Sequence, residues 1–299
     1  TYSKFNENMK QHLSYLEKMN DSLKSITPLN FSIEKFYQVG HVRKCFYQIN
    51  YDENFKNALK YSFDFCGYID NLNGIKQSIK DSVLGKCKFV KKETKFKDAY
   101  FPITESIPIK NSYNLNKQMI ITGPNAAGKT TLLKTTLFNI ILSQQIGYGC
   151  YKSASLVLFD NIHCYINIPD TSGRDSLFQA EARRCKDILS LVESNSNERH
   201  FCVFDELYSG TNPYEAISSA TAYLKYLNKF PNVCFILTTH FLDLCKKLDK
   251  DKKIINYHME ITGTQFDFRY TYRLISGISD IKGGVKVLND LEYPSEIIE

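Results

Sequence analysis

The apolar residues in the first part of the chain recur at the spacing of a helix. From Thr1 to about Ile26 they fall at intervals close to three and four, which is the repeat of one face of an α-helix. A second run with mostly the same spacing extends from Phe55 to Ile75. Residues 1–86 are therefore predicted to form a helical segment.

Beyond Cys87 the pattern changes to short apolar runs that alternate with helical stretches. The runs cover residues 118–121, 201–204 and 235–238, and a helix is expected from Lys129 to about Gln145. Strands that alternate with helices favour an α/β domain with a mostly parallel sheet. We expect this second domain to span residues 87–299.

Composition narrows the class of protein without deciding its function. With 43% hydrophobic and 23% charged residues over 299 positions, the chain is neither collagen-like nor largely disordered. No apolar run approaches the roughly 20 residues that span a bilayer, so we expect no membrane segment within this chain. The nine cysteines are scattered and form no C-x-x-C pair, which argues against a zinc ribbon and favours an intracellular protein. The net charge of +6 permits phosphate contacts but is too mild to identify a nucleic-acid module.

The segment between the first apolar run and the following helix carries a phosphate-binding pattern. Residues 123–130 read GPNAAGKT and fit G-x-x-x-x-G-K-[ST], with a strand before and a helix after. Backbone N–H groups of such a loop point at phosphate oxygens, Lys129 would contact the β- and γ-phosphates, and Thr130 would bind Mg²⁺. The alternative is a glycine-rich turn with a surface lysine. The candidate nucleotide-binding residues are Gly123, Pro124, Asn125, Ala126, Ala127, Gly128, Lys129, Thr130 and Thr131.

Acidic and imidazole side chains follow the other two apolar runs. Asp205 would hold Mg²⁺, and the adjacent Glu206 would polarise a water that attacks the γ-phosphate. His240 follows the third run, where it would sense the γ-phosphate. The alternatives are an acidic helix start without chemistry and a structural histidine. Because ligands in open α/β sheets bind beyond the carboxyl ends of the strands, we expect these side chains at one site.

Taken together, these motifs resemble the MutS family of DNA mismatch-repair ATPases, a branch related to the ABC-type ATPases. Residues 120–130 are similar to that family's Walker A, residues 205–214 to its D-E-x-x-x-G-T-x-x-Y segment, and residues 239–241 to its T-H-[YF]. Residues 173–181 resemble the signature S-x-F-x-x-E, whose serine here is Ser176. The resemblance covers about residues 90–299, ending in a strand at 272–277 and a closing helix at 291–298. The first 85 residues fit only loosely with the family's helical lever.

The resemblance implies an ATP- and Mg²⁺-dependent enzyme that works as a dimer. Two ATPase domains would pair, in a homodimer or a MutS-like heterodimer, and Ser176 of one subunit would reach the γ-phosphate held by Lys129 of the other. The alternative for Ser176 is a helix cap. In this family an aromatic residue often stacks on the adenine, yet Pro108 stands at that position, and Ile109 is our candidate for an apolar contact.

The main functional hypothesis is a Mg²⁺-dependent ATPase module whose nucleotide cycle closes a dimer and moves attached helical or DNA-handling domains. The alternatives are a nucleotide-gated dimerisation switch with little hydrolysis, and an ABC-like ATPase of chromosome maintenance or transport, which the lack of an L-S-G-G-Q pattern disfavours. DNA would be bound by domains outside this chain. Thr1 in place of an initiator Met indicates a processed form or a fragment.

Overall fold

The computed structural model describes residues 2–28, 32–102, 107–168, 176–263, 268–279, 288–294 and 296. The chain divides into two compact units, residues 1–81 and 82–299. The sequence-based boundary after residue 86 falls inside strand β1 (Gly85–Phe89), which pairs with β5 (Tyr148–Gly149) and β6 (Ser153–Leu156). Because the partners of β1 lie in the second unit, the strand belongs to that unit.

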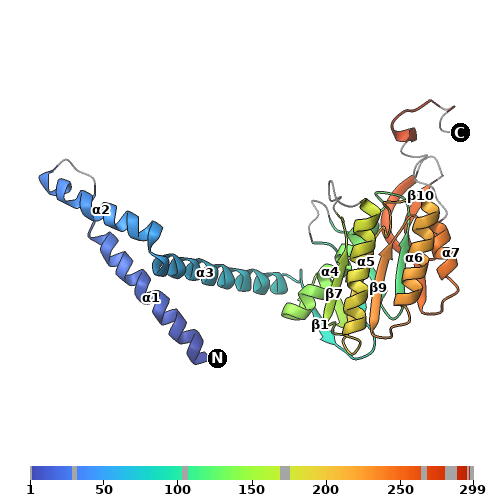
Figure 1. Ribbon diagram of the computed structural model, residues 1–299, viewed down its shortest axis with the longest axis horizontal. Helices are drawn as coiled ribbons and strands as arrows, with labels where there is room; N and C mark the ends of the chain where they lie inside the picture. Colours follow the sequence, from blue (N-terminus) through green and yellow to red (C-terminus); the bar gives the residue numbers. More distant parts are fainter. Residues whose placement is uncertain are drawn as a thin grey trace. The chain divides into compact units, whose positions relative to one another are not determined.

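Three helices make up the first unit. They are α1 (Tyr2–Lys24), α2 (Ile33–Tyr51) and α3 (Glu53–Lys80) (Figure 1). Helix α1 packs mainly against α3, where His12 stacks on Tyr61 with 4.3 Å between the ring centroids. The carboxylate of Asp52 caps α3 by accepting hydrogen bonds from the main-chain N–H groups of Asn54 and Phe55.

The hydrophobic pattern does not predict α2, although α1 and α3 coincide with the two expected helical runs. The large apolar side chains of α2 are mostly exposed, including Phe36, Tyr37, Phe46 and Tyr47. Cys45 is its buried residue. A helix without one apolar face leaves no repeat of 3.6 residues for the sequence to reveal.

A six-stranded sheet organises the second unit. Its strands are β4 (Gln118–Thr122), β7 (Asn161–Tyr165), β8 (His200–Asp205), β9 (Val233–Thr238), β10 (Ile254–Gly263) and β11 (Phe268–Ser276). They lie in the order β11–β10–β4–β9–β8–β7, and every neighbouring pair is parallel except the antiparallel pair of β10 and β11. Within the described residues, the longer helices of this unit are α4 (Lys129–Ile146), α5 (Leu177–Ser194), α6 (Pro213–Leu227) and α7 (Leu242–Leu248), and residues 288–290 form a short helical turn. No helix within the described ranges is long and apolar enough to cross a membrane.

The core of this unit lies on both faces of the six-stranded sheet, because successive residues of a strand point to opposite faces. Ile120 and Phe204 pack with apolar residues of α5, α6 and α7. Ile121 and Val203 pack on the other face, with apolar residues of α4. Figure 1 shows α5, α6 and α7 together on one side of the sheet. The mixed α/β class expected from the sequence is confirmed.

A second sheet, which the sequence pattern does not predict, packs against α4. It has five strands in the order β3–β2–β6–β1–β5, with β2 at Lys95–Ala99 and β3 at Asn111–Asn114. These strands are two to five residues long and carry many exposed polar positions, so they leave no clear apolar run. The hydroxyls of Tyr113 on β3 and Thr136 on α4 are hydrogen-bonded at 2.7 Å. Helix α4 is thus held between two sheets.

Candidate functional site

The 123–130 loop connects β4 to α4. Gly123 and Gly128 adopt positive φ angles of 144° and 92°, and Gly128 is the N-cap of α4, with no side-chain cap. A Cβ atom at Gly128 would lie 3.0 Å from the ring of Tyr272, so the close approach and the backbone angle both require glycine. Ala126 is also left-handed, at φ 62°. The loop therefore leaves the first N–H groups of an 18-residue helix available to an anion.

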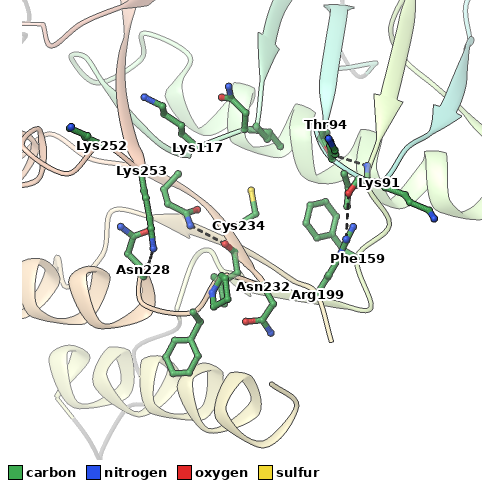
Figure 2. Close-up of a pocket in the computed structure, with 18 residues that line it drawn as sticks. Lys91, Thr94, Lys117, Phe159, Arg199, Asn228, Asn232, Cys234, Lys252 and Lys253 are labelled. Atoms are coloured by element: carbon green, nitrogen blue, oxygen red, sulfur yellow. Dashed lines mark hydrogen bonds between the residues drawn. The ribbon is translucent and has the colours of Figure 1, made fainter. Parts of the chain in front are cut away.

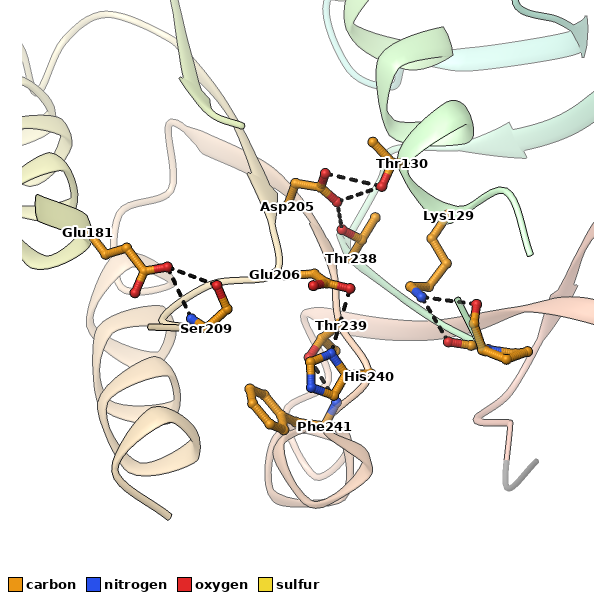
Figure 3. Close-up of polar contacts among 12 residues, drawn as sticks. Lys129, Thr130, Glu181, Asp205, Glu206, Ser209, Thr238, Thr239, His240 and Phe241 are labelled. Atoms are coloured by element: carbon orange, nitrogen blue, oxygen red, sulfur yellow. Dashed lines mark hydrogen bonds and ion pairs between the residues drawn. The ribbon is translucent and has the colours of Figure 1, made fainter. Parts of the chain in front are cut away.

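Lys129 is the first residue of α4, and its side chain turns back over the loop. Its Nζ donates hydrogen bonds to the carbonyl oxygens of Gly123 at 2.9 Å and Pro124 at 3.1 Å (Figure 3). The residue is 5% exposed. Burial lowers the pKa of the ammonium, while Glu206 and Asp205 oppose that shift. The lysine is thus an integral part of the loop, which rules out the alternative of a surface side chain.

Two strands and one helix meet at Asp205, which ends β8, Thr238, which ends β9, and Thr130 in the first turn of α4. The Thr130 hydroxyl donates to the two carboxylate oxygens of Asp205 at 2.9 and 3.1 Å, and the Thr238 hydroxyl donates to Oδ1 (Figure 3). Hydroxyl and carboxylate oxygens are the hard ligands that Mg²⁺ prefers, and one or two protein ligands suffice when phosphates and water complete the shell. The described residues contain no group of three or more His, Cys, Asp or Glu side chains placed to hold a metal. This donor set therefore fits Mg²⁺ bound together with phosphates.

Glu206 and His240 form a second polar pair beside Asp205. His240 Nδ1 lies 3.6 Å from Glu206 Oε1, and the two side chains are 47% and 37% exposed. The imidazole lowers the pKa of the Glu206 carboxyl, and partial burial acts in the opposite direction. Glu206 has a left-handed backbone at φ 53°, as does Tyr208 at 59°. The next helix, α6, begins at Pro213 and is capped by Asn212, so the acidic pair does not start a helix.

Ser176 is the N-cap of α5. Its hydroxyl accepts a hydrogen bond from the main-chain N–H of Gln179 at 3.3 Å, and its own N–H donates to the Gln179 side chain at 2.9 Å, which completes a capping box. The helix-cap alternative thus describes the local role of Ser176. The preceding signature residues 173–175 lie outside the described residues.

Glu181 is a buried carboxylate whose role the sequence did not predict. In the sequence it stands only as the glutamate that ends the S-x-F-x-x-E signature. It is 2% exposed, and one of its oxygens accepts hydrogen bonds from the N–H and hydroxyl of Ser209, at 3.1 and 3.0 Å. Its other oxygen accepts from the N–H of Gly210 at 3.1 Å. The carboxylate therefore ties α5 to the segment that follows Asp205 and Glu206.

Replacing Glu181 with glutamine is expected to lower the free energy of unfolding by roughly 1–3 kcal/mol, because the amide NH₂ of a buried side chain would face one of the three N–H and O–H donors. Thermal unfolding followed by circular dichroism measures the effect. Asp187→Asn, at an exposed position of α5, is the matched control and should leave the melting temperature unchanged. Equal melting temperatures for both variants would show that the three hydrogen bonds contribute nothing.

A cavity of about 290 Å³ opens beside the 123–130 loop. Gly128 and Thr131 line one side of it, and Ile109, Pro108 and Tyr272 line another. The amide of Asn111 donates to the carbonyl oxygen of Tyr272 at 3.0 Å, which joins β3 to β11 at its wall. The sequence suggested Ile109 here but not Tyr272, because the aromatic residue follows the loop by more than 140 positions. The cavity has room for a flat aromatic ring next to the 123–130 loop.

The second unit of the chain is similar to proteins of one known family. The family model described as MutS domain V matches residues 119–299. Three proteins named DNA mismatch repair protein MutS, from Persephonella marina, Parabacteroides distasonis and Aquifex pyrophilus, are 30%, 31% and 30% identical to this chain. The alignments cover 69%, 60% and 60% of this chain and 24%, 21% and 21% of those relatives. The chain thus spans less than a quarter of the length of these relatives.

Proposed function

Because this chain belongs to the MutS family, whose domain V covers residues 119–299, we propose that its second unit is the Mg²⁺-dependent ATPase module of a MutS-like DNA repair protein. One observation carries the proposal. Lys129, Asp205, Glu206 and His240 gather at the carboxyl edge of β4, β8 and β9, which are neighbours in the sheet. That edge is where open α/β sheets bind their ligands.

ATP is the substrate in this proposal. Its β- and γ-phosphates are held by the N–H groups at the start of α4 and by Lys129, whose ammonium neutralises charge on the transferring group. The adenine occupies the cavity between Ile109 and Tyr272. The apolar and aromatic walls there suit a flat ring, which supports this assignment.

Glu206 is the proposed general base. Its lowered pKa keeps the carboxyl ionised at neutral pH, so it can polarise a water for attack on the γ-phosphate. His240 lies against Glu206 and orients it. Thr130 and Asp205 would hold Mg²⁺, which supplies charge neutralisation for the phosphate oxygens when it is bound.

The proposed module acts as a dimer, with Ser176 of a second subunit completing the site. As the N-cap of α5, Ser176 presents the N-terminal end of an 18-residue helix, whose partial positive charge favours phosphate. DNA contacts are assigned to parts of the protein beyond domain V, and nucleotide-driven closure of the dimer would move them.

Removal of Mg²⁺ tests the proposed activity. Phosphate release from ATP by the chain is expected to fall on the order of 10²-fold when EDTA is added, because the phosphate charge loses its counter-ion, and to recover on addition of excess Mg²⁺. Steady-state phosphate release, with ATP binding measured on the same sample, provides both readouts. Turnover that is indifferent to EDTA would contradict the proposal, and ATP binding without turnover would favour the nucleotide-gated dimerisation switch.

A further inference from the structure

A second pocket, with a volume of about 500 Å³, lies at the opposite edge of the six-stranded sheet from the 123–130 loop. It is formed at the amino ends of β4, β8 and β9, where Lys117, Arg199 and Asn232 immediately precede the three strands (Figure 2). A strand of five or six residues is about 17–20 Å long. The pocket is therefore separate from the candidate ATP site. We call it the basic pocket.

Positive charge distinguishes the basic pocket. Six cationic side chains from four separate segments line it, and among the described residues no Asp or Glu does. The cations are Lys91, Lys92, Lys117, Arg199, Lys252 and Lys253. Within the described part of the chain, none of the six forms an ion pair with a carboxylate. These six charges equal the net charge of the whole chain, which is +6.

The nearby acidic side chains are engaged in other contacts. Asp160 accepts a hydrogen bond from the main-chain N–H of Arg199 at 2.8 Å, and Asp251 accepts from the main-chain N–H of Lys253 at 2.9 Å. Glu93 pairs with Lys95 at 2.7 Å, and Lys95 does not line the pocket. These carboxylates thus hold the backbone that presents the cations, without forming an ion pair with any of the six within the described residues.

The inner wall of the basic pocket combines apolar rings with a polar group that lacks a partner. Phe159 and Phe230 line it together with Asn228. Asn228 is 4% exposed, its amide NH₂ donates to Asp251 at 2.6 Å, and its Oδ1 is buried without a hydrogen-bond partner. A buried acceptor without a donor is costly. Phe159 and Phe230 thus give the basic pocket an apolar wall beside its cations.

We propose that the basic pocket binds the phosphate groups of nucleotides, either free or within a nucleic-acid strand. Phosphates concentrate several negative charges in a small volume, and lysine is a common point-charge partner for them. The base of a nucleotide supplies a flat face for the phenylalanine rings. An acidic peptide carries one charge per side chain, so matching six cations would require a chain that extends far outside a pocket of this size.

Lysine footprinting tests the proposal at the site itself. The chain is treated with a lysine-acetylating reagent alone or with a short single-stranded oligonucleotide, with ADP, or with poly-glutamate, and peptides are quantified by mass spectrometry. The oligonucleotide or ADP is expected to slow acetylation of Lys92, Lys117 and Lys252 several-fold. Lys186 and Lys225, on the exposed faces of α5 and α6, should not change. Because acetylation is read residue by residue, protection of Lys92, Lys117 and Lys252 reports occupancy of the basic pocket and not of the ATP site.

A matched pair of triple variants completes the test. Replacing Lys92, Lys117 and Lys252 with glutamine should weaken binding of the protecting probe about tenfold or more at low salt, because three phosphate-facing charges are lost. Replacing Lys186, Lys225 and Lys246 with glutamine changes the net charge equally and should leave that binding within about twofold. Protection by the oligonucleotide alone assigns a strand, and protection by ADP alone assigns a free nucleotide. Three outcomes would overturn the proposal. These are protection by poly-glutamate only, no protection by any probe, and equal losses of binding in both triple variants.

Discussion

A Glu206→Gln variant is expected to bind ATP as tightly as the unaltered chain and to hydrolyse it about 10²- to 10⁴-fold more slowly, the range that a positioned general base contributes. Glutamine keeps the size of the side chain and its place beside His240 but cannot take up a proton. Phosphate release gives the rate, and titration with a fluorescent ATP analogue gives the affinity. A drop in affinity with unchanged turnover would assign Glu206 to binding and refute its role as base.

The pH dependence of turnover provides a second readout for the same residue. The pKa of Glu206 lies below its ordinary value of 4.5, so its carboxylate stays charged on acidification until the pH falls below that value. The loss of turnover that depends on Glu206 should therefore lie below pH 4.5 and be absent in Glu206→Gln. Glu215→Gln, at an exposed position in the first turn of α6, is the control and should keep the parental profile.

Lys129→Ala is expected to weaken ATP binding by tenfold or more and to reduce turnover by about 10³-fold, because it removes the charge that we propose neutralises the β- and γ-phosphates. It also leaves the carbonyl oxygens of Gly123 and Pro124 without their lysine donor. A thermal unfolding curve is therefore recorded for the same sample, to separate loss of function from loss of the fold.

Lys134→Ala serves as the control for this variant, since Lys134 lies on the same helix and does not line the cavity beside the loop. It should bind and hydrolyse ATP as the parent does. If Lys129→Ala unfolds at the parental temperature and still turns over ATP at the parental rate, the 123–130 loop is not the catalytic phosphate site.

The strands that carry the site were predictable because they are buried on both faces. A central parallel strand between two helical layers is apolar throughout, and such a run is visible in the sequence. The runs at 201–204 and 235–238 correspond to β8 at His200–Asp205 and β9 at Val233–Thr238. The helix expected to end near Gln145 ends at Ile146, where Gly147 in a left-handed conformation follows it.

The contacts between motifs were not predictable, because the order of strands in the sheet differs from their order in the chain. β9 lies between β4 and β8 in the sheet, yet Thr130, which follows β4 in the chain, bonds to the same Asp205 carboxylate as Thr238 of β9. Nothing in the sequence indicates a role for Thr238 except that it stands shortly before His240. Glu181 and Tyr272 were missed for the same reason, since their partners Gly210 and Gly128 are distant along the chain.

The left-handed backbone at Glu206 has a consequence for the evolution and engineering of this domain. An L-residue at φ 53° costs about 1 kcal/mol relative to glycine. Selection for stability alone would therefore favour glycine or asparagine at position 206. Variants of the chain that are selected for stability should lose glutamate at position 206, unless ATP hydrolysis is selected as well. The residue found at position 206 would therefore show whether selection acted on stability alone or also on hydrolysis.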